Sequence, residues 1–156
     1  MVKQNYQIQK IRQSRTAKAI AKNQPISLKY STEIIANIKG MRIDKAMEFL
    51  ERIRNMEEYL PLRKYNKKVG HRKGEAKGFA KAGRYPIRAV TTFLGLLEGV
   101  RANADYKGLD SDNLIITHMF ASQGFQRLSY QAKGKISGKK RKKKSTHLEI
   151  VVTEGK

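Results

Sequence analysis

The sequence predicts an α+β fold, with three helices packed on a small antiparallel β-sheet, a long β-hairpin extension and a basic N-terminal tail. Helices are indicated by apolar residues that recur every three or four positions in three stretches. Strands are indicated by two runs, 114–120 and 148–153, that are rich in β-branched and aromatic residues. The extension and the tail are indicated by positive charge concentrated in segments between these elements.

The first two predicted helices lie close together in the chain. Ser31 is a candidate N-cap for the first, and Gly40 follows its last residue as a stop signal. The second is expected to start near Arg42 and to end before Pro61. Each has one apolar side, which predicts one buried face and one solvated face. The residues of these apolar sides are Ile34, Ile35 and Ile38, then Ile43, Ala46, Met47, Leu50, Ile53 and Met56.

The third predicted helix has the clearest signals. Pro86 stands where a first-turn proline is tolerated, and Gly108 follows the last periodic residue. Its apolar positions are Val90, Phe93, Leu97, Val100 and Ala104.

About 27 residues, 121–147, separate the two predicted strands, and they contain few core-forming side chains. This is long for a connection in a compact domain, which indicates a functional or disordered segment. We expect the strands to continue outward as a hairpin over about 119–147 and to turn near 132–135, where Gly134 can adopt a positive φ. Twenty extended residues span roughly 65 Å at ~3.3 Å each. A two-stranded ribbon of this kind needs a partner to be ordered.

Composition indicates the class of partner. The chain has 156 residues and a net charge of +21, which favours a polyanionic partner. It contains no cysteine, which excludes a disulfide scaffold and thiolate metal sites. No apolar run approaches ~20 residues and the N-terminus lacks the apolar stretch of a signal peptide, so we expect a soluble protein of the cytosol or nucleus.

Strongly basic blocks alternate with blocks of nearly zero net charge along the chain. Residues 1–30 carry seven basic and no acidic residues, 61–90 carry ten and one, and 121–147 carry nine and none. Like charges repel, so we expect these blocks to be tails or loops that settle on an anion. The predicted organisation is a basic tail over 1–26 and one α+β domain over 27–156, with a basic loop at 61–84.

The basic blocks supply the candidate RNA-binding residues. Arginine can bridge phosphates, and aromatic residues among bases, here Tyr65, Phe79 and Tyr85, can stack on unpaired nucleotides. Tyr85 and Phe79 can instead be ordinary core residues, and the sequence slightly favours that interpretation for each. The candidates are Arg12, Arg15, Lys18, Arg63, Lys64, Lys67, Lys68, His71, Arg72, Lys73, Arg84, Arg88, Arg127, Lys139, Lys140, Arg141, Lys142, Lys143 and Lys144. The uninterrupted run at 139–144 is also compatible with a nuclear-import patch or a solvated linker, and it is expected to neutralise phosphates without reading bases.

Catalytic and metal sites are not indicated. His71, His118 and His147 lack the spacing of a metal motif, and a histidine such as His118 in an apolar strand is more often a satisfied interior group. Asp110 and Asp112 resemble half of a calcium loop without its remaining ligands. We therefore expect no enzyme activity, no cofactor and no bound metal.

Four separated segments carry a resemblance to a known family. They are residues 37–46 (NIKGMRIDKA), 60–71 (LPLRKYNKKVGH), 83–89 (GRYPIRA) and 102–110 (ANADYKGLD). Together they resemble the ribosomal protein L twenty-two family, called L seventeen in older eukaryotic naming, and the long basic segment resembles its archaeal and eukaryotic branch. The resemblance covers roughly residues 27–154.

The resemblance implies a structural constituent of the large ribosomal subunit. Its α+β body would bind large-subunit ribosomal RNA near the peptide exit, and its hairpin would line the exit tunnel. The returning strand of that hairpin matches residues 147–150. The expected partners are ribosomal RNA, neighbouring large-subunit proteins and the nascent chain at the tip, with no membrane and no homo-oligomer. The expected location is the cytoplasmic ribosome, or the nucleolus during assembly in a eukaryote. The tip matches Tyr130, Gln131, Ala132, Lys133, Gly134 and Lys135.

Two other interpretations of the basic segments stay open. A free-standing DNA- or RNA-binding architectural module could use the same tails, with the third helix as a reader, although that helix has few base-reading groups. A membrane-surface protein could use polybasic segments on anionic lipid, but it would need a basic amphipathic helix, and the predicted helices are near neutral.

Overall fold

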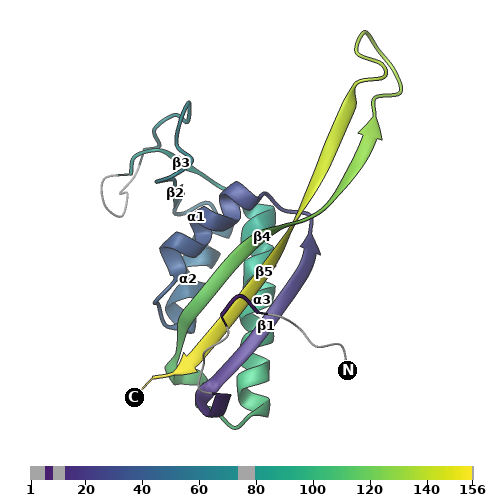
Figure 1. The fold of residues 1–156 in the computed structure, drawn as a ribbon. Coiled ribbons are helices and arrows are strands. Elements are labelled where there is room, and N and C mark those ends of the chain that lie inside the picture. The colour runs from purple at the N-terminus through teal and green to yellow at the C-terminus, as the bar shows by residue number, and fades with distance from the viewer. Residues whose placement is uncertain (1–5, 9–12, 74–79, 156) are drawn as a thin grey trace.

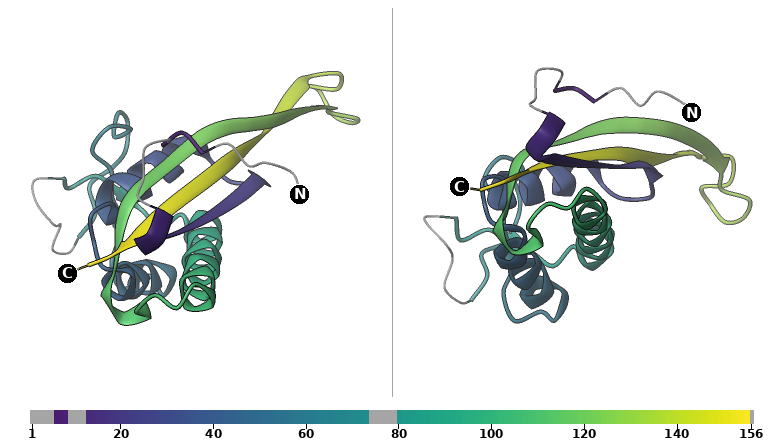
Figure 2. Two further views of the ribbon diagram at one scale, coloured as in Figure 1. Left: turned by 60° about the horizontal axis from the view of Figure 1, so that its bottom comes forward. Right: turned by 90° about the horizontal axis from the view of Figure 1, so that it is seen from below.

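The computed structural model describes residues 6–8, 13–73 and 80–155. In these residues three α-helices pack on an antiparallel sheet of three strands in the order β1-β5-β4 (Figure 1), which confirms the predicted α+β class. The helices lie on one side of the sheet (Figure 2, right), with α1 against β4, α3 against β1, and α2 against α3. The elements are η1 Gln13–Arg15, β1 Thr16–Gln24, α1 Leu28–Ile38, α2 Ile43–Arg54, β2 Leu60–Pro61, β3 Gly83–Arg84, α3 Ile87–Tyr106, η2 Ser111–Asn113, β4 Leu114–Tyr130 and β5 Lys140–Glu154.

Strand β1 is the main difference from the sequence prediction, which placed residues 1–26 in a tail. Thr16–Gln24 pairs with β5 from Thr16↔Thr153 to Ala21↔Leu148, at the edge of the sheet. Alanine and lysine are poor strand formers, so propensity gives little sign of this strand. It is held instead by packing, because Ala17, Ala19 and Ala21 contact the hydrophobic core.

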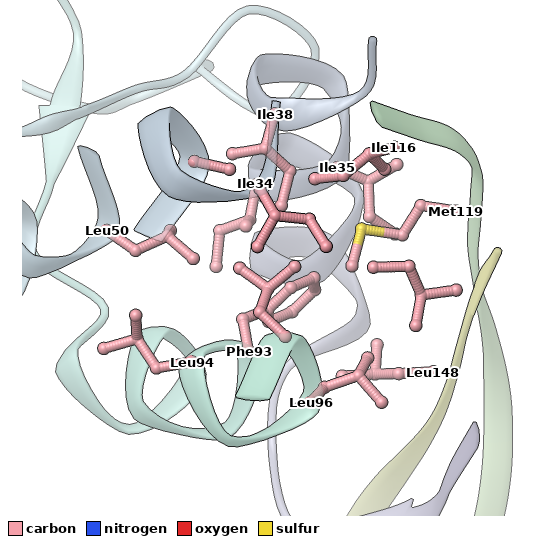
Figure 3. Packing of buried hydrophobic residues seen from close by; sticks show 14 of the residues in the cluster. Ile34, Ile35, Ile38, Leu50, Phe93, Leu94, Leu96, Ile116, Met119 and Leu148 are labelled. Carbon is pink, nitrogen blue, oxygen red and sulfur yellow. The ribbon is translucent and has the colours of Figure 1, made fainter. Parts of the chain in front are cut away.

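The core lies between the helices and the sheet (Figure 3). Phe93 of α3 and Ile34 of α1 point toward each other, and Ile38, Leu97 and Leu148 belong to the same buried cluster. Full burial of such a side chain stabilises the fold by roughly 1.5–3 kcal/mol. The predicted apolar faces therefore do point into one core.

The helix ends differ from the prediction in two places. Helix α1 begins one turn earlier than predicted, because Ser27 is the N-cap and Ser31 lies buried inside the helix, where its hydroxyl donates to the Ser27 carbonyl at 2.9 Å. Helix α2 begins after Arg42 as predicted, but it ends at Arg54, so Met56 leaves the apolar stripe and is 58% exposed. Phe49, which the predicted apolar side did not include, is buried.

Helix α3 follows the prediction at both ends. Pro86 is its N-cap, and Gly108 comes two residues after its last residue, Tyr106, with a φ of +70°. A positive φ is the conformation that glycine adopts at low cost.

The predicted hairpin extension is confirmed, because β4 and β5 remain paired as far as Tyr130↔Lys140. The extension stands clear of the helices (Figure 1). Gly134, in the turn, has a φ of +89°, and the Gln131 N–H donates to the Lys139 carbonyl at 3.1 Å to close it.

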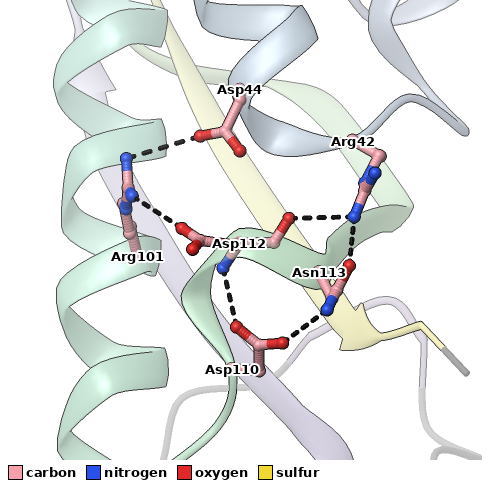
Figure 4. A network of polar contacts seen from close by, with 6 residues as sticks. All are labelled: Arg42, Asp44, Arg101, Asp110, Asp112 and Asn113. Carbon is pink, nitrogen blue, oxygen red and sulfur yellow. Dashed lines mark hydrogen bonds and ion pairs between the residues drawn. The ribbon is translucent and has the colours of Figure 1, made fainter.

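A polar network holds together the end of the body away from the hairpin (Figure 4). Arg101 of α3 contacts the carboxylates of Asp44 and Asp112, each at 3.4 Å. Arg42 donates to the Asp112 carbonyl at 3.2 Å and to the side chain of Asn113. Asp110 caps η2 by accepting from the Asp112 N–H at 3.1 Å. The two aspartates that resemble half of a calcium loop thus serve as structural caps and ion-pair partners.

Candidate nucleic-acid interface

The basic loop is attached to α1 through one buried carboxylate. Glu33 is 1% exposed and accepts three backbone N–H groups from the start of the loop, from Arg63 at 3.0 Å, Lys64 at 2.8 Å and Tyr65 at 2.6 Å. A buried carboxylate must be paired or hydrogen-bonded to be tolerated, and three amides satisfy it. Because the backbone makes these contacts, the side chains of Arg63 and Lys64 remain directed to solvent, and both residues are exposed.

The loop also carries aromatic rings in contact with cations. The Arg72 guanidinium lies 5.4 Å from the Tyr85 ring centroid, and the Lys29 and Lys64 ammonium groups lie 5.5 and 5.9 Å from that of Tyr65. Tyr85 and Tyr65 are half-buried, and Phe79 lies outside the described residues. The following predicted RNA-binding residues of the loop are exposed: Arg63, Lys64, Lys67, Lys68, His71, Arg72 and Lys73.

The hairpin arm distributes its cations over both faces. Side chains directly opposite each other in paired strands share a face. One face therefore carries Lys140 beside Tyr130 and Lys142 beside Leu128, and the other carries Arg141 beside Ser129. Arg127 and Lys143 are also directly opposite, so two like charges share that second face. The basic run that the sequence presents as one block is thus divided between the two sides of a ribbon.

A bulge marks the point where the arm leaves the body. The register shifts between Gln123 and Gln126, and Asn23 at the end of β1 contacts both strands there. The Asn23 side-chain oxygen accepts from the Phe125 N–H at 3.0 Å and from the Ser145 hydroxyl at 3.2 Å. A Cβ on Gly124 would lie 2.6 Å from the Ser145 hydroxyl oxygen, so only glycine fits this position unchanged. The junction is therefore built to fix the direction of the arm.

A cleft of about 580 Å³ brings the loop and the arm together. It is lined by Tyr65 from the loop, Lys29 from α1, and Lys142 and Lys144 from the arm. None of the described residues that line it is acidic. Two segments far apart in the sequence thus form one positively charged surface.

The remaining candidates are distributed around the body. Arg15 and Arg88 are exposed, Lys18 and Arg84 are half-buried, and Arg12 lies outside the described residues. Arg127 and the cations at 139–144 are exposed along the arm and its turn. The tip residues 132–135 are exposed as well.

Two of the three histidines, His118 and His147, make hydrogen bonds within the fold. His118 Nε2 lies 3.0 Å from the buried carboxylate of Glu149, which also accepts from the Gln7 N–H at 3.2 Å. His147 Nδ1 accepts from the Asn23 N–H at 3.0 Å. Burial, followed by the charge of Glu149, raises the pKa of Tyr6 above its ordinary value. Across the described residues, no group of three or more His, Asp or Glu is placed to hold a metal ion.

No helix in the described ranges is long and apolar enough to cross a membrane. Helix α2 pairs two of its three basic residues, Arg52 and Arg54, with Glu48, Glu51 and Glu58. Sequence analysis missed the role of Glu33, since a single glutamate in an isoleucine-rich helix gives no sign of the three amides it binds.

Known proteins resemble this chain over most of its length. The family model described as Ribosomal protein L22p/L17e matches residues 19–153. A protein named large ribosomal subunit protein uL22 from Methanocaldococcus jannaschii is 36% identical over 99% of this chain and 97% of its own length. Proteins of the same name from Ignicoccus hospitalis and Methanopyrus kandleri are 41% identical over 90% and 47% identical over 70% of this chain, and are covered over 89% and 69% of their own lengths. The chain therefore belongs to the ribosomal protein L22p/L17e family.

Proposed function

We propose that this protein is a structural, non-catalytic constituent of the large ribosomal subunit, which binds large-subunit ribosomal RNA and places its hairpin along the polypeptide exit tunnel. The observation that carries the proposal is the arm: a paired ribbon, anchored by a rigid junction, with cations on both faces and no acidic residue between Gln123 and Thr146. Membership of the family and the names of its relatives support the same function.

Repulsion between its own positive charges destabilises the paired strands of the arm when no anion is bound to them. Like charges directly opposite in a sheet destabilise the pair, and Arg127↔Lys143 is such a pair. An isolated two-stranded ribbon is marginal in water in any case. Phosphates on both sides would turn this repulsion into attraction and would release counterions, which is the main source of affinity for RNA. We therefore infer that the arm lies between RNA segments rather than on one of them.

The apolar side chains of the arm fit this environment. Phe125 is 66% exposed, Leu128 57% and Tyr130 62%. Aromatic rings among phosphate-binding cations can stack on unpaired bases. The tip, residues 130–135, would then be the part closest to the nascent chain, with neighbouring large-subunit proteins around the body on ribosomes in the cytoplasm.

A charge-matched comparison tests this function. One triple variant replaces Lys140, Lys142 and Lys144 by serine, and a control triple variant replaces Lys39, Lys45 and Arg54, which are exposed on the body. Binding to a large-subunit ribosomal RNA transcript is measured against salt concentration. We expect the arm variant to lower the salt slope by about three units, since each lost phosphate contact removes ~0.9. The control is expected to lower it by less than about one unit.

Equal slopes in the two variants would contradict a specific role of the arm. Equal affinity of the wild-type chain for RNA and for DNA of the same sequence would favour a free-standing architectural module instead. A photo-crosslinker at Lys133 in ribosomes with a stalled nascent chain tests the position of the tip, and the proposal expects a crosslink to that chain or to tunnel RNA.

A further inference from the structure

A groove of about 830 Å³ runs between the edge strand β1 and helix α3. Tyr6 also lines it, and the Lys18 ammonium lies 5.6 Å from the centroid of the Tyr6 ring. Lys18, Ala19 and Ala21 line it from β1, and Thr92, Gly95 and Gly99 line it from α3. The two elements are neighbours in the fold (Figure 1). Small residues on both walls keep the groove open along the helix.

The two glycines are not required by the fold of the chain itself. Gly95 and Gly99 lie in the interior of α3, where glycine is among the least favourable residues. A Cβ at either position would meet no atom within 4 Å, so alanine would fit and would favour the helix. Glycine in such a place is useful where another backbone approaches closely. The described residues thus leave open space beside both glycines.

The free edge of β1 is already blocked against an added strand. Side chains use three of its backbone carbonyls: the Asn103 amide donates to that of Lys18 at 2.9 Å, the Lys107 ammonium to that of Thr16 at 2.8 Å, and the Gln24 amide to that of Lys22 at 3.2 Å. Addition of a strand needs a row of free carbonyl and N–H groups. An extended protein segment is therefore not the occupant that this edge favours.

The charge of the groove favours an anion. Lys18 and Arg88 line it, and none of its described lining residues is acidic. Arginine and lysine supply the common contacts to phosphate oxygens. The groove is therefore suited to a chain that carries phosphates and has a narrow backbone.

Two hydroxyl groups add a preference for ribose. Thr91 Oγ1 donates to the Ile87 carbonyl at 3.1 Å and Thr92 Oγ1 to the Arg88 carbonyl at 3.0 Å. Their protons are thus used within the helix, and their oxygens can still accept from a ligand. The ribose 2′-hydroxyl is such a donor, and DNA lacks it.

We propose that the β1–α3 groove holds the sugar–phosphate backbone of a single RNA strand, with Lys18 and Arg88 on phosphates and Gly95 and Gly99 allowing the ribose to approach the helix. This inference rests on the proposed function and names a second RNA site, separate from the arm and the basic loop. It explains why the middle of the longest helix keeps two residues that weaken it.

The test fills the groove without changing charge. The variant Gly95→Gln/Gly99→Gln is compared with Ala36→Gln, which adds a similar side chain at an exposed position of α1. The midpoint temperature of thermal unfolding of the groove variant is expected to equal or exceed that of the wild type, since glutamine has a higher helix propensity than glycine. Its binding to large-subunit ribosomal RNA is expected to weaken, with a salt slope lower by about 1.4 units, because Lys18 and Arg88 lose their phosphates and each contact to a single strand contributes ~0.7. The control is expected to match the wild type in both measurements.

A crosslink identifies the occupant. The chain has no cysteine, so Gly99→Cys can be labelled uniquely with a benzophenone in the purified protein, which is then assembled into the subunit. A crosslink to ribosomal RNA supports the inference, and a crosslink to a protein overturns it. If the groove variant binds ribosomal RNA with the same affinity and salt slope as the wild type, the inference is also overturned. The proposed function is unaffected by that result, because the wild-type chain still binds ribosomal RNA. Failure of the wild type to bind would instead overturn the proposed function and this inference with it.

Discussion

Replacement of Glu33 by glutamine tests how the basic loop is attached to the body. Glu33 Oε1 accepts from the N–H groups of Lys64 and Tyr65, and Oε2 accepts from that of Arg63. Glutamine has nearly the same shape but only one oxygen. If that oxygen takes the Oε1 position, the amide nitrogen faces the Arg63 N–H, and two donors then oppose each other.

The expected loss in the free energy of unfolding follows from these three hydrogen bonds. A hydrogen bond to a charged group contributes about 1.5–3 kcal/mol, and a neutral one about half as much. The variant loses the bond from Arg63 and weakens the other two, while water can reach part of the exposed loop. We therefore expect the free energy of unfolding to fall by about 3 kcal/mol. The loop should also lose its position, which lowers affinity for RNA because its cations must then be ordered on binding.

Urea unfolding and hydrogen exchange measure the two effects. In Glu33→Gln, protection of the amides of residues 63–65 from hydrogen exchange should fall under conditions in which the amides of the rest of the body remain protected. The matched control is Glu48→Gln, whose carboxylate is 69% exposed and pairs with Arg52 at 2.6 Å. A surface pair of this kind contributes about 0–1 kcal/mol, so the control should unfold close to the wild type. Equal stability of both variants, with protection at 63–65 unchanged, would refute the attachment through Glu33.

Three further predictions concern the arm. Replacing all six cations at 139–144 by serine should weaken incorporation into the large subunit and lower the salt slope of RNA binding by about five units; an unchanged slope would argue against phosphate contacts. Removing residues 125–144 and joining the ends with a short glycine turn should leave one cooperative thermal transition, because the core lies entirely in the body; loss of that transition would show that the arm supports the fold. Gly124→Ala should lower the free energy of unfolding by about 1–3 kcal/mol through overpacking against Ser145, whereas a neutral effect in urea unfolding would show that the junction can relax.

Most of the fold could be predicted because local patterns and tertiary packing agree. Pro86 and Gly108 mark α3 correctly, and the apolar positions of all three helices point into the core apart from Met56. The hairpin followed from chain length, since 27 residues without core-forming groups between two strands leave few compact alternatives. The exposed cations of the loop and arm followed from charge repulsion alone.

The remaining features depend on contacts between distant residues. Five of the nine residues of strand β1 are alanine or lysine, and the strand forms because α3 and β5 lie beside it. The anchoring of the loop by Glu33 joins residues about 30 positions apart, and Asn23 meets Phe125 and Ser145 only in the folded chain. The spacing of apolar residues and the secondary-structure propensities describe single segments and carry no information on contacts between distant residues. The groove along β1 could not be predicted for the same reason.

Sedimentation of the tagged protein in cell lysate tests the central claim most directly. The lysate is run through sucrose gradients at moderate and high salt, with and without ribonuclease. The account predicts migration with the large ribosomal subunit, retained after a high-salt wash because many phosphate contacts act together, and lost when the RNA is digested. Migration as a free small protein, or release at modest salt, would contradict it.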